Sequence, residues 1–118
     1  MNCCKVAFVL GVMAAFVAPI GSAAEPVRLT RDGTNKRDPH FIRGGEALIY
    51  CYDETAALIR MMQIDLPDGE PTPVFEDAGN NHHLEPDVSP DGRYIAYTQC
   101  TGKLTARLVL RDLQESKQ

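Results

Sequence analysis

The chain is short and acidic, which restricts both its architecture and its partners. Its 118 residues leave room for one small domain, and they carry 12 basic against 16 acidic side chains, for a net charge of −4. An acidic chain without a basic patch does not suit nucleic acids or anionic membrane surfaces. We therefore exclude both of these partner classes from the prediction.

The first residues are typical of an export signal. Lys5 is the only charged residue among them, and residues 6–18 form a continuous apolar run. A retained membrane anchor would need about 20 apolar residues, whereas Pro19 ends this run early. We therefore predict a cleaved signal peptide over residues 1–24, which makes the protein periplasmic or secreted and leaves it without a stable membrane anchor.

The remainder of the chain contains an internal repeat with a constant offset of 47 residues and no gap. The identical pairs are Pro26-Val27 with Pro73-Val74, Pro39 with Pro86, Gly45 with Gly92, Tyr50 with Tyr97, Arg60 with Arg107, and Asp65-Leu66 with Asp112-Leu113. A period of this size is typical of proteins that stack one supersecondary unit on the next.

The second copy gives the clearer view of the repeated unit. Residues 86–89 can form a short strand, residues 89–92 read Ser-Pro-Asp-Gly and predict a turn, and residues 93–98 are a strand rich in aromatic and β-branched residues. In the first copy, a Gly-Gly pair takes the place of the turn. The residues to which we assign a structural turn role are Gly45, Pro90, Asp91 and Gly92.

The segment that follows is ambiguous in the first copy. Residues 54–66 contain good helix formers and would pass as a short amphipathic helix. Their counterpart, residues 106–113, alternates between polar and apolar side chains as a strand does. We predict a strand in both copies, with a helix as the alternative, and a short outer strand at residues 72–76. Each complete unit is then a four-stranded antiparallel meander, and the fold class is all-β.

The motif Glu85-Pro86-Asp87-Val88, followed by SPDGRYIAY over residues 89–97, resembles the repeat of the TolB-like β-propellers. Residues 38–50 resemble the same unit, although Arg43-Gly44 stands where the motif has Pro-Asp. The resemblance covers residues 26–113. It implies that each repeat is a propeller blade, and that the chain acts in the bacterial periplasm as a docking platform for envelope proteins, such as the peptidoglycan-associated lipoprotein.

The domain organisation that follows is an incomplete propeller. We assign residues 25–37 to an N-terminal outer strand and loop, 38–77 to a first blade, 78–113 to a second blade that lacks its outer strand, and 114–118 to a polar tail. Closed propellers have about four to eight blades. Since the strand predicted over residues 26–30 matches the outer strand, it can complete another copy, and three chains would then form a six-bladed homotrimer. A truncated gene product is the alternative.

Four residues are candidates for partner binding. Asp38 and Glu85 occupy equivalent acid-proline positions at the start of the innermost strands, which in the resembling family line the central channel. His40 and Asp87 follow closely and share that environment. The alternative is that these acids satisfy local backbone donors in turns.

Metal and thiol chemistry are the remaining possibilities that the residues raise. His82 and His83 are the best available metal ligands, but adjacent residues of an extended segment point to opposite sides, so we predict a polar loop over residues 77–84 and no metal. Cys51 and Cys100 are not at equivalent repeat positions, and we expect free or intermolecularly paired thiols in preference to an internal bridge.

No sequence motif for a nucleophile elbow, a phosphate-binding loop, a dinucleotide site or a zinc protease is present. We therefore predict a non-catalytic, extracytoplasmic protein-binding module without a cofactor, whose partner is an envelope protein or another copy of the chain. The alternatives are a detached propeller cap of a prolyl-oligopeptidase-like hydrolase and a non-functional gene fragment.

Overall fold

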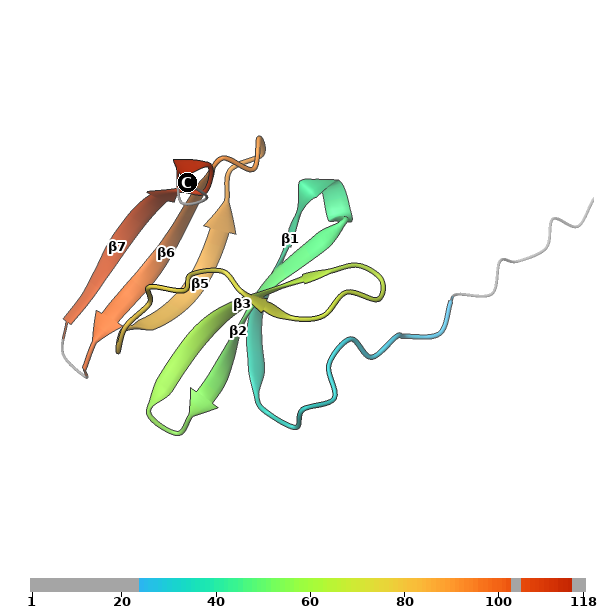
Figure 1. The fold of residues 1–118 in the computed structure, drawn as a ribbon, viewed down its shortest axis with the longest axis horizontal. Helices are drawn as coiled ribbons and strands as arrows, with labels where there is room; N and C mark the ends of the chain where they lie inside the picture. Colours follow the sequence, from blue (N-terminus) through green and yellow to red (C-terminus); the bar gives the residue numbers. More distant parts are fainter. Residues whose placement is uncertain (1–23, 103–104, 116–118) are drawn as a thin grey trace, which may run out of the picture.

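The computed structural model describes residues 24–102 and 105–115, and this part of the chain is mostly β (Figure 1). It contains two antiparallel sheets, one of four strands and one of three, which do not close into a ring. No α-helix occurs among these residues. The all-β prediction is confirmed, whereas residues 1–23 of the predicted signal peptide and residues 116–118 of the predicted polar tail lie outside the described ranges.

Both sheets are simple meanders in which each strand pairs with the next one along the chain. The first sheet contains β1 (Lys36–Ile42), β2 (Ala47–Thr55), β3 (Leu58–Asp65) and β4 (Thr72–Pro73). The second sheet contains β5 (His82–Val88), β6 (Tyr94–Thr101) and β7 (Thr105–Asp112). Figure 1 shows the sheets side by side, with β5 as the strand of the second sheet that lies nearest the first.

The repeat seen in the sequence is also present in the strands. The boundaries of β5, β6 and β7 lie 47 residues after those of β1, β2 and β3, to within one residue. The strand predicted within residues 54–66 is confirmed as β3, and the helix alternative is wrong. Because β3 pairs along its whole length with β2, the ladder of backbone hydrogen bonds outweighs the helix propensity of its residues.

The turns that connect the first two strands of each sheet depend on glycine. Gly92 has φ 72°, and its N–H donates to the carbonyl oxygen of Ser89 at 2.8 Å. The Asp91 carboxylate accepts hydrogen bonds from the Ser89 hydroxyl at 2.5 Å and from the Arg93 N–H at 3.1 Å. In the first copy, a 3₁₀ turn over residues 43–45 includes Gly45 with φ 97°. Gly45, Pro90, Asp91 and Gly92 all lie within these two turns.

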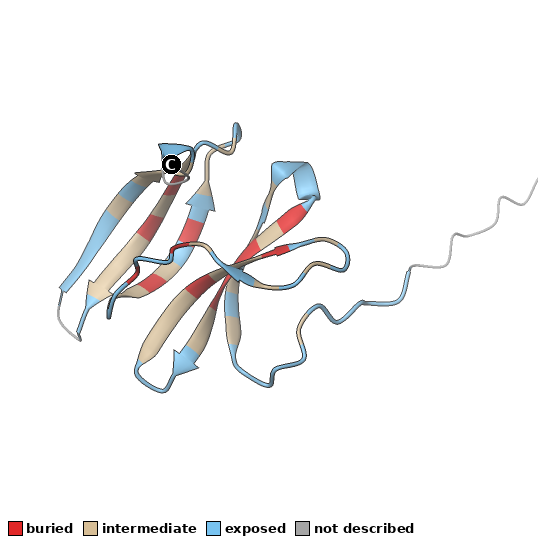
Figure 2. Ribbon diagram, viewed as in Figure 1, coloured by how far each residue is buried: buried red, intermediate tan, exposed pale blue. Residues whose placement is uncertain are grey.

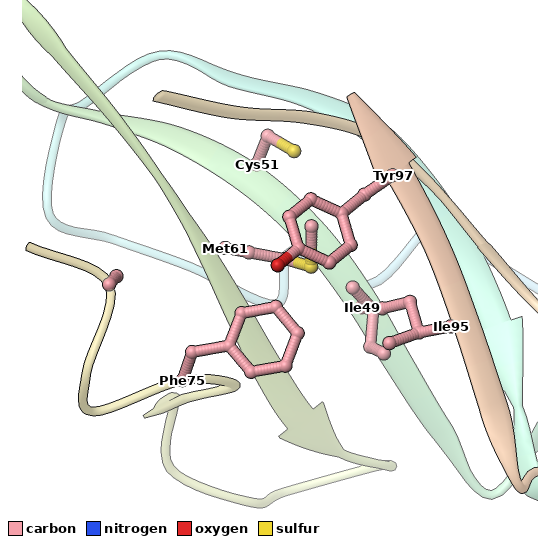
Figure 3. Packing of buried hydrophobic residues seen from close by; sticks show 7 residues of the cluster. Ile49, Cys51, Met61, Phe75, Ile95 and Tyr97 are labelled. Carbon is pink, nitrogen blue, oxygen red and sulfur yellow. The ribbon is translucent and has the colours of Figure 1, made fainter. Parts of the chain in front are cut away.

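An apolar core lies between the two sheets (Figure 2). The first sheet contributes Ile49, Cys51 and Met61, and the second contributes Ile95 and Tyr97. The connection from β4 to β5 adds two further buried residues, Phe75 and Ala78. Figure 3 shows Phe75, Met61 and Tyr97 close together within this core. Because residues of both sheets are buried against each other, the core holds β1 and β5 at a defined distance.

Three predicted segments differ from the structure. The outer strand expected over residues 72–76 pairs only at Thr72–Pro73, because Phe75 turns inward to the core. The polar loop expected over residues 77–84 is shorter, since β5 already begins at His82. The segment predicted as a first strand, residues 26–30, is irregular in this single chain.

Candidate functional site

The structure brings the four predicted partner-binding residues together. β1 and β5 lie in contact, and the Asp38 carboxylate accepts a hydrogen bond from the backbone N–H of Glu85 at 3.3 Å. His40 Nε2 lies 3.5 Å from the Asp87 carboxylate. We call these four residues the inner-strand site. Since two come from each copy, the site exists only where the two repeats meet.

Both acids at the centre of this site have an unusual backbone. Asp38 has φ 52° and Glu85 has φ 53°, and each lies at a β-bulge in its strand. A left-handed conformation costs a residue other than glycine about 1–2 kcal/mol. The same strain therefore occurs at the same position of both copies. Strained residues of this kind cluster at binding sites, and bulges re-aim side chains there.

The site is acidic and open to solvent. Asp87 has a side chain that is 80% exposed, and Glu85 is also exposed. The nearest β1 cation, Arg37, is already paired with Asp53 at 2.5 Å. The site therefore contains three carboxylates and one imidazole, and the Glu85 carboxylate accepts a hydrogen bond from the Thr98 hydroxyl at 3.2 Å. Such a surface is suited to accept hydrogen bonds from a cationic or N–H-rich partner.

A cleft of about 280 Å³ opens next to His40. It lies between the two glycine turns, with residues 41–44 on one wall and residues 88–92 on the other. Phe41 lines this cleft and is 66% exposed. Phe41 directly follows His40, so it adds an exposed apolar side chain at the edge of the acidic site, and apolar and polar contacts together are the usual composition of a protein-binding surface.

Cys51 lies behind the inner-strand site and is fully buried. Burial raises the pKa of its thiol to about 12, and the nearby Asp38 charge acts in the same direction. A thiol with this pKa stays protonated at neutral pH, so it is not a nucleophile. Both Cys51 and Cys100 are free in the structure.

The two adjacent histidines occupy different environments. His82 Nδ1 accepts a hydrogen bond from the Ile59 N–H at 3.3 Å. His83 is 2% exposed and packs its ring against Tyr97 and Phe75, with ring centroids at 4.9 and 5.5 Å. No group of three or more His, Cys, Asp or Glu side chains within the described ranges has an arrangement that could hold a metal ion.

The burial of His83 is the main feature that sequence reasoning missed. Burial lowers the pKa of its imidazole, and the charges of Arg60 and Arg111 lower it further. The Arg111 guanidinium also stacks on Phe75 at 4.5 Å and pairs with Asp77 at 2.9 Å. Side chains alternate between the two faces along β5. If the predicted strand had begun at His82, this alternation would have placed His83 on the inner face. This cluster anchors the connection between the sheets.

No protein-family model matches this chain, and no curated protein matches it. No helix in the described portion has the length and apolar character needed to cross a membrane.

Proposed function

We propose that this protein is an exported, non-catalytic binding module built of TolB-like propeller blades, and that it binds a protein of the cell envelope through the inner-strand site. The observation that carries the proposal is the pair of strained acids, Asp38 and Glu85, placed side by side at equivalent positions of two repeats. A chain under selection for stability alone has no reason to keep carboxylates at two left-handed positions, where glycine fits without strain.

The chemistry of the site indicates what the partner presents. Its carboxylates accept hydrogen bonds, so the partner must present hydrogen-bond donors, such as lysine or arginine side chains or free backbone N–H groups. Phe41, at the adjoining cleft, offers an apolar contact of the type that often dominates binding energy. We therefore expect a partner segment that combines a positive charge with an apolar side chain.

The motif supports the blade and export parts of this proposal. Residues 85–97 carry the acid-proline and Ser-Pro-Asp-Gly elements of the resembling repeat, and the 47-residue offset is kept in the strand boundaries. The apolar run over residues 6–18 supports export. Expression with the native N-terminus, followed by cell fractionation and N-terminal sequencing, tests this part. Periplasmic material that starts at residue 24 or 25 is expected, and uncleaved cytoplasmic material would contradict export.

Binding is tested by photo-crosslinking in intact cells. A photoreactive phenylalanine analogue replaces Pro90, an exposed residue that lines the cleft, and the same analogue at Asp68, in an exposed turn, serves as the control. We expect an envelope-protein adduct from position 90 and none from position 68. The double substitution Asp38→Asn with Glu85→Gln keeps side-chain size and removes two charges, so it should abolish the adduct. Equal adducts at both positions, or an adduct insensitive to the double substitution, would contradict the proposed site.

A further inference from the structure

The two sheets pack against each other with different faces, and this asymmetry defines two surfaces. In the first sheet, the face that bears Ile49, Cys51 and Met61 points at the second sheet; we call it face A. In the second sheet, the face that bears Ile95 and Tyr97 points at the first; we call it face B. Because the sheets are repeats of one unit, each of them has both faces. The internal contact is therefore head to tail, face A on face B.

Face A of the second sheet is apolar and uncovered, whereas face B of the first sheet is covered in part. Met61, on face A of the first sheet, is 3% exposed, whereas its counterpart Leu108 on β7 is 81% exposed. The next face A position of the second sheet is Leu110, which is 69% exposed. On face B of the first sheet, Phe41 is 66% exposed whereas its counterpart Val88 packs on the core, but Tyr50 and Ile64 are already buried, at 4% and 2% exposed. Figure 2 shows that β7 is largely exposed. The uncovered parts are face A at β7 and the end of face B that bears Phe41, and each matches the surface that covers its counterpart inside the chain.

The N-terminal segment already follows the path that this packing requires. Val27, Leu29 and Thr30 border an apolar groove of about 280 Å³ together with Leu48 and Tyr50, on face B of the first sheet. Their counterparts, residues 74–77, lie next to face B of the second sheet, where Phe75 contacts Tyr97. Residues 27–30 thus lie on face B of the first sheet, in the same way that the β4–β5 connection lies on face B of the second sheet.

Residues 25 and 26 are the counterparts of β4. β4 pairs with β3 through Met62↔Pro73 and Gln63↔Thr72. The counterpart of β3 is β7, and no described strand pairs with its outer edge. Shifted by one repeat, the same register pairs Val109 with Pro26 and Leu110 with Glu25. An edge strand without a neighbour is a template for strand addition from another chain.

We propose that copies of this chain assemble head to tail, with residues 25–26 of one copy added to the outer edge of β7 in the next. Face A of the second sheet then packs on face B of the partner's first sheet, as the sheets pack within one chain. A contact of this heterologous type generates a ring when the rotation closes. Three copies supply six sheets, which is within the range of about four to eight found in propellers. The inference does not depend on the four residues of the inner-strand site, and it assigns the exposed side chain of Phe41 to the contact between copies.

Directed disulfide crosslinking tests the register of this contact. The exported chain is prepared with Cys100→Ser, while Cys51 stays because its buried thiol is unreactive. Chains with Pro26→Cys are mixed with chains with Val109→Cys and oxidised. We expect a covalent dimer from the mixture and none from either variant alone, since the contact joins different surfaces. With Thr105→Cys in place of Val109→Cys, at the far end of β7, no dimer should form. A dimer from either variant alone, or none from the mixture, would overturn the proposal.

A second measurement uses side chains whose replacement leaves the single chain intact. Leu108→Lys with Leu110→Lys alters two exposed residues of face A, so the circular dichroism spectrum should be unchanged. In light scattering on a size-exclusion column, the unmodified chain is expected at about three times the mass of the double variant. Thr105→Lys on the same strand should keep the larger mass. A monomeric unmodified chain, or a double variant that stays assembled, would refute the inference and leave the inner-strand proposal untouched.

Discussion

The interpretation that two sheets share one core predicts a large effect from a single substitution, Ile95→Ala. Ile95 is fully buried between the sheets, where the core also contains Ile49 and Tyr97. The change removes three carbon atoms, each worth about 0.8 kcal/mol of burial, and leaves a cavity that adds to the loss. We expect a fall of about 3–4 kcal/mol in the free energy of unfolding. Since domains of this size have about 5–15 kcal/mol in total, the loss is a large share of the stability.

The assay is urea unfolding followed by far-ultraviolet circular dichroism, because the chain has no tryptophan. With a slope of about 1–3 kcal/mol per molar urea, the midpoint should fall by about 1–4 M. Ile95→Val should cost about 1 kcal/mol, and Thr105→Ala, at an exposed position, less than about 0.5 kcal/mol. A loss below about 1 kcal/mol for Ile95→Ala would refute the shared core, and with it the fixed spacing of the inner-strand site.

Three further outcomes follow from local environments. Because burial holds the pKa of His83 below its ordinary value of 6.5, the unfolded imidazole takes up its proton first as the pH falls; stability should therefore decrease from pH 7 to pH 5, and His83→Gln should reduce this slope in urea titrations. Gly92→Ala forces a side chain into a φ of 72° and should cost about 1 kcal/mol in the same assay, with no loss indicating a relaxed turn. Cys100 should react with a thiol reagent at pH 8 in the folded chain, whereas Cys51, whose pKa is about 12, should react only after unfolding. Equal rates at the two thiols would contradict the burial of Cys51.

Much of the fold could be predicted because each structural segment occurs twice in the chain, with two different sequences. The strand at β3 is ambiguous by itself, but its counterpart over residues 105–112 alternates clearly, and both are strands in the structure. The turns at Gly45 and Gly92 follow from residue types that tolerate positive φ. The grouping of Asp38 and Glu85 also follows from the repeat, since equivalent positions of adjacent units lie side by side.

The remaining features depend on contacts that no local pattern contains. Phe75 ends the pairing of β4 because its ring is buried between the sheets, and this burial depends on partners distant in the sequence. Histidine is a polar residue type, yet the His83 ring packs against two aromatic rings. The positive φ at Asp38 and Glu85 could not be predicted either, because each precedes a proline, a position that ordinarily favours an extended backbone.

The conformation of Asp38 separates two selective pressures that usually act together. Most substitutions at a binding site lower stability or leave it unchanged, so a loss of binding is easily confused with a loss of folding. Asp38→Gly removes the left-handed penalty at a φ of 52° but also removes the carboxylate that accepts a hydrogen bond from the Glu85 N–H, so the two effects on stability oppose each other. A variant that is as heat-resistant as its parent and yet fails to engage its partner would identify a residue that is retained for binding and not for folding.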